Sequence, residues 1–72
     1  MQSTRTPAYR RFLARLKAAR QDAGMTQVEV ARRLRKTQAF VSKSESGDRR
    51  VDVIELKAFA RLYRKPVAYF LE

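Results

Sequence analysis

The sequence predicts a single all-α domain of five short helices. Apolar residues recur at the spacing of a helix face along most of the 72 residues. Thr26 and Asp52, each followed three residues later by Glu, form two capping boxes of the kind that begin helices. The chain has no internal repeat, low-complexity tract or linker. We therefore assign residues 1–7 to a flexible N-terminal arm and residues 8–72 to one folded domain.

Composition limits the chemistry that the chain can perform. It contains no cysteine and no histidine, which removes disulfides, thiolate metal sites and the usual general base. No cluster of carboxylates takes their place. We therefore expect no metal, no cofactor and no enzymatic activity.

Charge points to a polyanionic partner. The 17 Lys and Arg residues outnumber the 7 Asp and Glu residues and give a formal charge of +10. Such a charge favours nucleic acid ahead of a membrane surface. No apolar run is long enough to span a membrane, and the N-terminus lacks the apolar segment of a secretory signal. A cytoplasmic location is the expectation.

The first helix is predicted to begin near Pro7 and to end before Gly24, a natural C-terminal cap. Its inward stripe is apolar and comprises Tyr9, Phe12, Leu13, Leu16, Ala19 and Ala23. Arg20 falls within this stripe, where a guanidinium needs a buried carboxylate partner. Glu45 is the candidate, because it lies on the inward arc of its own helix.

The second helix is predicted to begin after Thr26 and to bury three apolar residues, Val30, Ala31 and Leu34. Gln27 lies in its first turn, where backbone N–H groups and the helix dipole favour an anion. The alternative is that Gln27 only solvates the start of the helix.

The third helix is predicted to run from its N-cap Thr37 to about Ser46, with Gly47 ending it. Its outward face is small or polar, carries no acid, and comprises Gln38, Ala39, Ser42, Lys43 and Ser46. Such a face suits a helix that enters the major groove of DNA, because its groups must reach base edges and phosphates would repel carboxylates.

The fourth helix is predicted to begin at Asp52 and to carry two apolar stripes. The core stripe comprises Val53, Leu56, Phe59, Ala60 and Tyr63, and the second comprises Ile54, Ala58 and Leu62. A short fifth helix follows, with Pro66 at its first position. It either covers the second stripe within the monomer or joins it in a dimer contact. The apolar surplus that leads us to expect a homodimer consists of Ile54, Leu62, Val67 and Tyr69.

A family resemblance rests on an ordered set of residues: Thr26-Gln27, Val30-Ala31, Leu34, Thr37-Gln38, Val41-Ser42-Lys43, Glu45, Gly47, Arg49-Arg50, Asp52, Leu56, Ala60 and the turn from Pro66 to Leu71. With these residues the chain resembles the phage-repressor-like helix-turn-helix proteins of the Cro/C1 type, or Xre family, from about Leu13 to Leu71. The resemblance implies a five-helix, lambda-repressor-like fold that binds palindromic double-stranded DNA as a homodimer.

The resemblance also supports roles for single residues. Base contacts are expected from the outward face of the third helix, namely Gln38, Ala39, Ser42 and Lys43. Phosphate contacts are expected from Thr26, Gln27, Ser46, Arg49 and Arg50. A matching Arg–Glu pair in the family agrees with Arg20–Glu45 as a structural ion pair.

Three residues depart from the family pattern. Arg35 stands where glycine is common, so a positive φ there carries an energetic cost. Lys36 replaces an apolar residue and is expected to point to solvent or to a phosphate. Ser44 replaces a large apolar residue, which leaves Phe40 and Val41 to pack the third helix and predicts that this helix is held less tightly.

The resulting functional expectation is a sequence-specific transcriptional regulator, with repression as its role and no small-molecule ligand. Two alternatives share the domain: an antitoxin or the controller of a restriction system. A third is an adaptor that uses the same fold for protein contacts and binds DNA weakly, without sequence preference.

Overall fold

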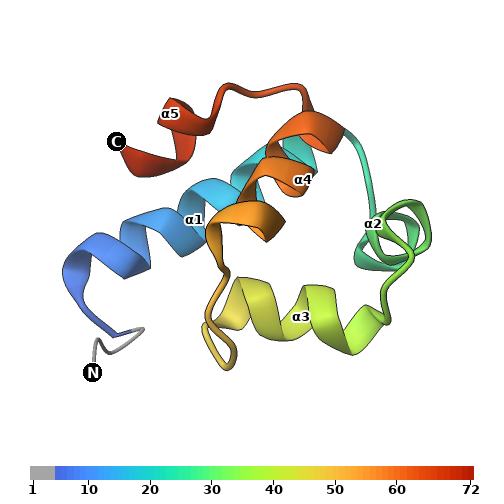
Figure 1. The fold of residues 1–72 in the computed structure, drawn as a ribbon, viewed down its shortest axis with the longest axis horizontal. Helices are drawn as coiled ribbons and strands as arrows, with labels where there is room; N and C mark the ends of the chain where they lie inside the picture. The colour runs from blue at the N-terminus through green and yellow to red at the C-terminus, as the bar shows by residue number, and fades with distance from the viewer. Residues whose placement is uncertain (1–4) are drawn as a thin grey trace.

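The computed structural model describes residues 5–72 and contains five helices (Figure 1). They are α1 (Pro7–Asp22), α2 (Gln27–Leu34), α3 (Gln38–Ser46), α4 (Val53–Tyr63) and α5 (Val67–Leu71). Within this range there is no strand, and the predicted all-α, five-helix fold is confirmed. Of the predicted arm, residues 1–4 lie outside the described range, and Pro7 is already the first residue of α1.

Short-range hydrogen bonds fix where the first four helices begin. In each case the N-cap side chain accepts the backbone N–H three residues further on, and the N-caps are Thr6, Thr26, Thr37 and Asp52. Both predicted capping boxes are present. The prediction for α5 is wrong by one residue, because Pro66 has an extended ψ of 150° and is the N-cap of that helix.

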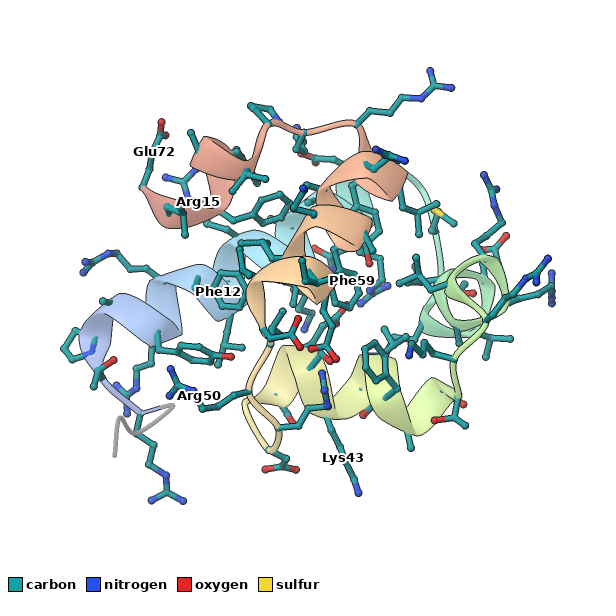
Figure 2. All side chains as sticks on the ribbon, viewed as in Figure 1. Phe12, Arg15, Lys43, Arg50, Phe59 and Glu72 are labelled. Carbon is teal, nitrogen blue, oxygen red and sulfur yellow. The ribbon has the colours of Figure 1, made fainter. Side chains whose placement is uncertain are left out.

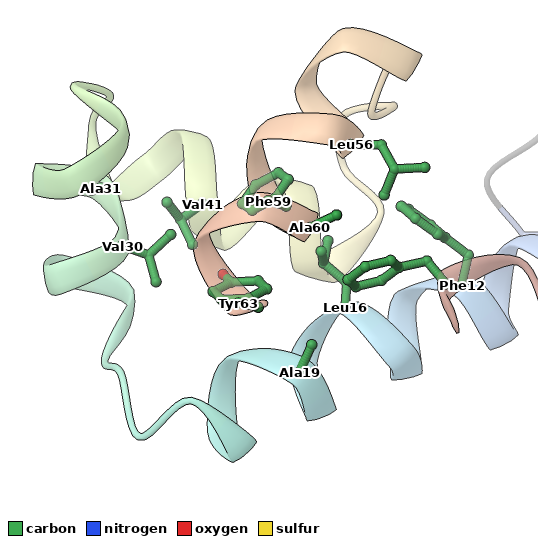
Figure 3. Close-up of a cluster of buried hydrophobic side chains, with 11 residues drawn as sticks. Phe12, Leu16, Ala19, Val30, Ala31, Val41, Leu56, Phe59, Ala60 and Tyr63 are labelled. Atoms are coloured by element: carbon green, nitrogen blue, oxygen red, sulfur yellow. The ribbon is translucent and has the colours of Figure 1, made fainter. Parts of the chain in front are cut away.

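The core lies where α1 passes beside α3, α4 and α5, while α2 packs on α3 (Figures 1 and 3). Its fully buried members come from all five helices and include Leu16, Val30, Val41, Phe59 and Phe70. Burying each such side chain stabilises the fold by about 1.5–3 kcal/mol. This packing holds α3 against the body along one side only, which leaves its other side to solvent.

The predicted stripes of α4 and α1 require corrections. Val53, assigned to the core, is 66% exposed, and Ile54 of the second stripe is 69% exposed. The reason is that α5 packs mainly along α1 and leaves the first turn of α4 uncovered. Ala58 is also exposed, and Ala23 is exposed because it lies beyond the last turn of α1, as its C-cap.

Arg35 does have a positive φ, for which the sequence indicated only the cost: its backbone is left-handed, with φ 59° and ψ 44°. The turn is closed by the Lys36 N–H, which donates to the Ala31 carbonyl at 2.9 Å. We expect Arg35→Gly to raise the free energy of unfolding by about 0.5–1 kcal/mol, because glycine occupies this conformation without a Cβ clash. Denaturant unfolding measures the change.

The matched control is Arg32→Gly, which places glycine inside α2 and should instead lower the free energy of unfolding by about 1 kcal/mol. Equal destabilisation by the two substitutions would contradict the conformational argument.

Candidate nucleic-acid interface

The outward side of α3 forms an exposed, acid-free surface along one edge of the domain (Figure 1). Gln38, Ala39 and Lys43 are exposed, and Ser42 is half-buried. The Lys43 side chain extends away from the body of the protein (Figure 2). The structure therefore brings the four residues predicted to contact bases onto one accessible helix, which presents an amide, a methyl, a hydroxyl and an ammonium group.

Arg20 and Glu45 meet inside the domain, as their positions on the helical wheel predict. Arg20 Nε lies 2.7 Å from Glu45 Oε2, and its Nη2 donates to Oε1 at 3.2 Å. The two side chains are only 13% and 5% exposed. Arg20 Nη1 also donates to the Met25 carbonyl at 2.9 Å, and the hydrogen bond to Glu45 raises the pKa of Arg20. One guanidinium thus joins α1, α3 and the segment that leads into α2.

Tyr63 places a hydroxyl next to this pair. The ring is 4% exposed, and its Oη has no hydrogen-bond partner among the described residues. Burial raises the pKa of Tyr63 above its usual range, so the hydroxyl stays protonated at any physiological pH. The neutral hydroxyl adds no second negative charge beside Glu45, so Tyr63 does not compete with Glu45 for the guanidinium of Arg20.

Gln27 is held by the same carboxylate. Its Nε2 donates to Glu45 Oε1 at 3.2 Å, and this bond fixes the orientation of the amide, because a carboxylate can only accept. The amide has a second N–H, which remains to be donated to another acceptor. The carboxylate of Glu45 therefore orients a donor at the first turn of α2.

Thr26 and Ser46 sit at helix ends and already make local hydrogen bonds. The Thr26 hydroxyl accepts the Glu29 N–H at 3.1 Å, and Glu29 Oε1 accepts the Thr26 N–H at 2.8 Å, which lowers the pKa of Glu29. The Ser46 hydroxyl donates to the Lys43 carbonyl and accepts the Asp48 N–H, both at 3.3 Å. Thr26 acts only as an acceptor here, so its own proton can still be donated to a phosphate.

The two arginines of the loop between α3 and α4 have different surroundings. Arg50 is exposed, with its guanidinium 5.1 Å from the centre of the Tyr9 ring, at the edge where α1 begins (Figure 2). Arg49 turns inward and forms an ion pair with Glu55 at 2.8 Å. This hydrogen bond raises the pKa of Arg49 and lowers that of Glu55. The expected phosphate contact of Arg49 therefore competes with an internal partner.

A family model described as helix-turn-helix matches residues 16–70. The chain belongs to the Cro/C1-type helix-turn-helix family. A search of curated proteins gave no match. The matched range covers the C-terminal part of α1, all of α2, α3 and α4, and α5 up to residue 70. It includes every residue assigned above to bases, phosphates or the Arg20–Glu45 pair.

In this helix-turn-helix domain α2 and α3 are the two helices of the motif, and the domain binds double-stranded DNA. Within the described residues, no group of three or more potential metal-ligating side chains comes together. Over residues 5–72, moreover, no helix combines the length and the apolar character needed to cross a bilayer.

Sequence reasoning missed two interactions of the helix-turn-helix domain, Gln27 with Glu45 and Arg49 with Glu55. The second had a signal in the sequence. A Glu at the third position of a helix turns back toward its N-cap, and an arginine in the preceding loop is then within its reach. The first depends on how α2 and α3 pack, which local spacing does not specify.

Proposed function

We propose that this helix-turn-helix domain is a sequence-specific transcriptional regulator that acts as a repressor, with α3 in the major groove. The observation that carries the proposal is the exposed, acid-free face of α3. In helix-turn-helix docking the second helix of the motif enters the major groove and the first crosses the backbone. Repression is the assigned role because occupation of a promoter is enough to block transcription.

Base readout is assigned to four side chains of α3. The Gln38 amide matches the N7 acceptor and N6 donor of adenine, and Lys43 can donate to guanine O6 or N7. The Ala39 methyl group suits contact with a thymine methyl, and Ser42 can donate or accept. Gln38 and Ala39 are in the first turn of α3, the part of a recognition helix that approaches base edges.

Phosphate contacts are assigned to residues that flank α3 on both sides. At the start of α2, Gln27 offers the second N–H of an amide already oriented by Glu45, next to Thr26. Beyond the end of α3, Ser46 and Arg50 are exposed. Contacts of this kind set register and supply salt-dependent affinity without reading sequence.

Arg50→Ala is expected to weaken binding to all duplexes by a similar factor and to reduce the slope of log affinity against log salt by about one. The measurement is a set of binding titrations at several salt concentrations. The matched control is Arg61→Ala, at the far end of α4 from Arg50, which should change the slope less. A changed sequence preference in Arg50→Ala would show that Arg50 reads bases instead.

We also propose a homodimer, on a face that differs from the one expected from sequence. Leu62, Val67 and Tyr69 are half-buried against the core, which leaves Ile54 as the exposed member of that set. An apolar groove of about 480 Å³ lies between α1, the start of α4 and α5. Val53 and Leu71 line it and are 66% and 68% exposed.

A second copy of the chain suits this groove. Arg11 and Asp52 both line it, so a copy related by a two-fold axis can place each beside the opposite charge. Two half-sites one helical turn apart would then give the palindromic operator expected for the family.

The dimer can be measured by sedimentation. We expect Leu71→Glu to raise the dimer dissociation constant by about tenfold or more, because it buries a charge in an apolar contact. Val28→Glu, at a 48% exposed valine of α2 away from the groove, serves as the control and should leave the constant unchanged. A wild-type protein that stays monomeric at high concentration, or equal effects of the two substitutions, would contradict this face.

Selection of bound duplexes from a random pool, at near-physiological salt, tests the proposed function. Non-specific phosphate attraction is weak under these conditions. We expect a recovered palindrome with half-sites about one helical turn apart. A folded protein that enriches no sequence would favour an adaptor that acts through protein contacts. Antitoxins and restriction controllers would also recover a site, and the genes beside that site would separate them from a repressor.

A further inference from the structure

A compact polar cluster joins the end of α3 to the start of α4. Arg49 Nη1 and Nη2 donate to the two oxygens of Glu55 at 2.9 and 2.8 Å. Nη1 also donates to the Ser44 hydroxyl at 3.2 Å. The guanidinium carbon lies 4.3 Å from the centre of the Phe40 ring. Arg49 therefore contacts α3 at two residues, one turn apart, while it pairs with α4.

Ser44 is built into this cluster. The residue is completely buried, yet its hydroxyl donates to the Phe40 carbonyl at 2.7 Å and accepts from Arg49. Both hydrogen-bonding roles of a hydroxyl are thus used, which removes the penalty for burying it. A large apolar side chain at this position would offer Arg49 no hydrogen-bond acceptor.

Glu55 and Phe40 connect the cluster to the rest of the fold. Oε1 of Glu55 also accepts the Asp52 N–H at 3.1 Å, as part of the capping box of α4. The Phe40 ring stacks on the buried Phe59 ring, with centroids 6.1 Å apart. The hydrogen bonds between Arg49 and Glu55 raise the pKa of Arg49 and lower the pKa of Glu55, as expected when both side chains are charged.

We propose that Arg49 is a positioning residue for DNA recognition: through Ser44, Phe40 and Glu55 it sets the orientation of α3 on the domain, and it does not act as a phosphate contact. This proposal rests on the proposed function, because it explains how the face of α3 that is proposed to contact bases is held in its orientation. Three of the N–H groups of Arg49 are already donated within the domain. The second guanidinium–carboxylate pair, Arg20–Glu45, holds α3 from the side of α1.

A positioning role and a phosphate-contact role for Arg49 predict different changes in DNA binding when Arg49 is replaced. A lost phosphate contact weakens binding to every duplex alike. A displaced recognition helix instead loses base contacts at its first turn, so it loses affinity for the selected duplex and keeps its affinity for others. Because one mismatched base pair changes affinity by about 5- to 150-fold, we expect the ratio of the affinity for the selected duplex to the affinity for the scrambled duplex to fall by about that factor.

The experiment measures this ratio, and the salt slope, for Glu55→Gln and Arg49→Gln, using the duplex selected by the wild type and a scrambled duplex of the same length. Glu55→Gln keeps an acceptor for the capping box of α4 but removes the ion pair. Asp48→Asn is the matched control, since it also replaces a carboxylate by its amide, at an exposed acid in the loop beside Arg49. Partial unfolding lowers both affinities equally and leaves the ratio unchanged.

The proposal expects a lower ratio in both variants, an unchanged ratio in Asp48→Asn, and a salt slope for Arg49→Gln within error of the wild type. If Arg49→Gln instead weakens both duplexes equally and reduces the slope by about one, Arg49 is a phosphate contact and the proposal is overturned. It is also overturned if Glu55→Gln behaves as Asp48→Asn. A wild type that selects no sequence overturns the proposed function itself, and with it this inference, before any variant is measured.

Discussion

Replacing Glu45 with Ala is expected to lower the free energy of unfolding by about 3–5 kcal/mol, because it leaves the guanidinium of Arg20 buried without its carboxylate. The same change removes the acceptor that orients Gln27. For a domain of this size such a loss lowers the melting temperature by more than about 10 °C. Denaturant unfolding at low temperature measures it without requiring the variant to be folded at 37 °C.

Asp48→Ala serves as the control for this prediction, since Asp48 is an exposed acid just beyond α3. It should change the free energy of unfolding by no more than about 0.5 kcal/mol. If the Glu45 and Asp48 variants had equal free energies of unfolding, the result would contradict the claim that the buried Arg20–Glu45 pair holds α3 against α1.

Gln38→Ala is expected to reduce the preference for one or two base pairs of the selected site by about 1–3 kcal/mol. The physical reason is that the proposed bidentate amide–adenine contact is lost, while the phosphate contacts proposed for α2 and the α3–α4 loop remain. Competition titrations with single-base-pair variants of the site give the preference at each position.

The matched control is Gln21→Ala, an exposed glutamine in the last turn of α1. It should leave every base-pair preference unchanged. An equal loss of affinity on all sequences in Gln38→Ala would count against direct readout by this side chain.

Helix boundaries could be predicted from sequence because they depend on local chemistry. The side chains of Thr26, Thr37 and Asp52 accept backbone N–H groups only three residues away, and the structure contains each of these bonds. The left-handed turn at Arg35 is also local, since it closes through hydrogen bonds to the residues just before it, but the sequence left the φ of Arg35 open because glycine does not occupy this position.

Contacts between helices were less predictable, because they depend on packing. The Arg20–Glu45 pair could be found since each residue is a charge on an otherwise apolar arc. Val53 carries no such marker in the sequence. It has the right spacing for the core stripe but is 66% exposed, because α5 packs mainly along α1.

Ser44 shows how a single residue type can mislead. Serine in place of a large apolar residue predicted a loosely held α3, whereas in the structure its hydroxyl makes two hydrogen bonds, one of them with Arg49. The compensating partner, Arg49, lies in a loop whose course the sequence does not specify. The sequence therefore predicted a phosphate contact for Arg49, whereas the contacts of Arg49 in the structure lead us to propose that it positions α3.

The central claim, that α3 reads bases in the major groove, is tested most directly by dimethyl sulfate footprinting on the selected duplex. This reagent methylates guanine N7 in the major groove and adenine N3 in the minor groove, and these atoms face those grooves in B-form DNA. We predict protection of guanine N7 within each half-site, loss of that protection at one guanine in Lys43→Ala, and unchanged adenine N3 reactivity there. Protection of adenine N3 with full reactivity at guanine N7 would contradict the claim.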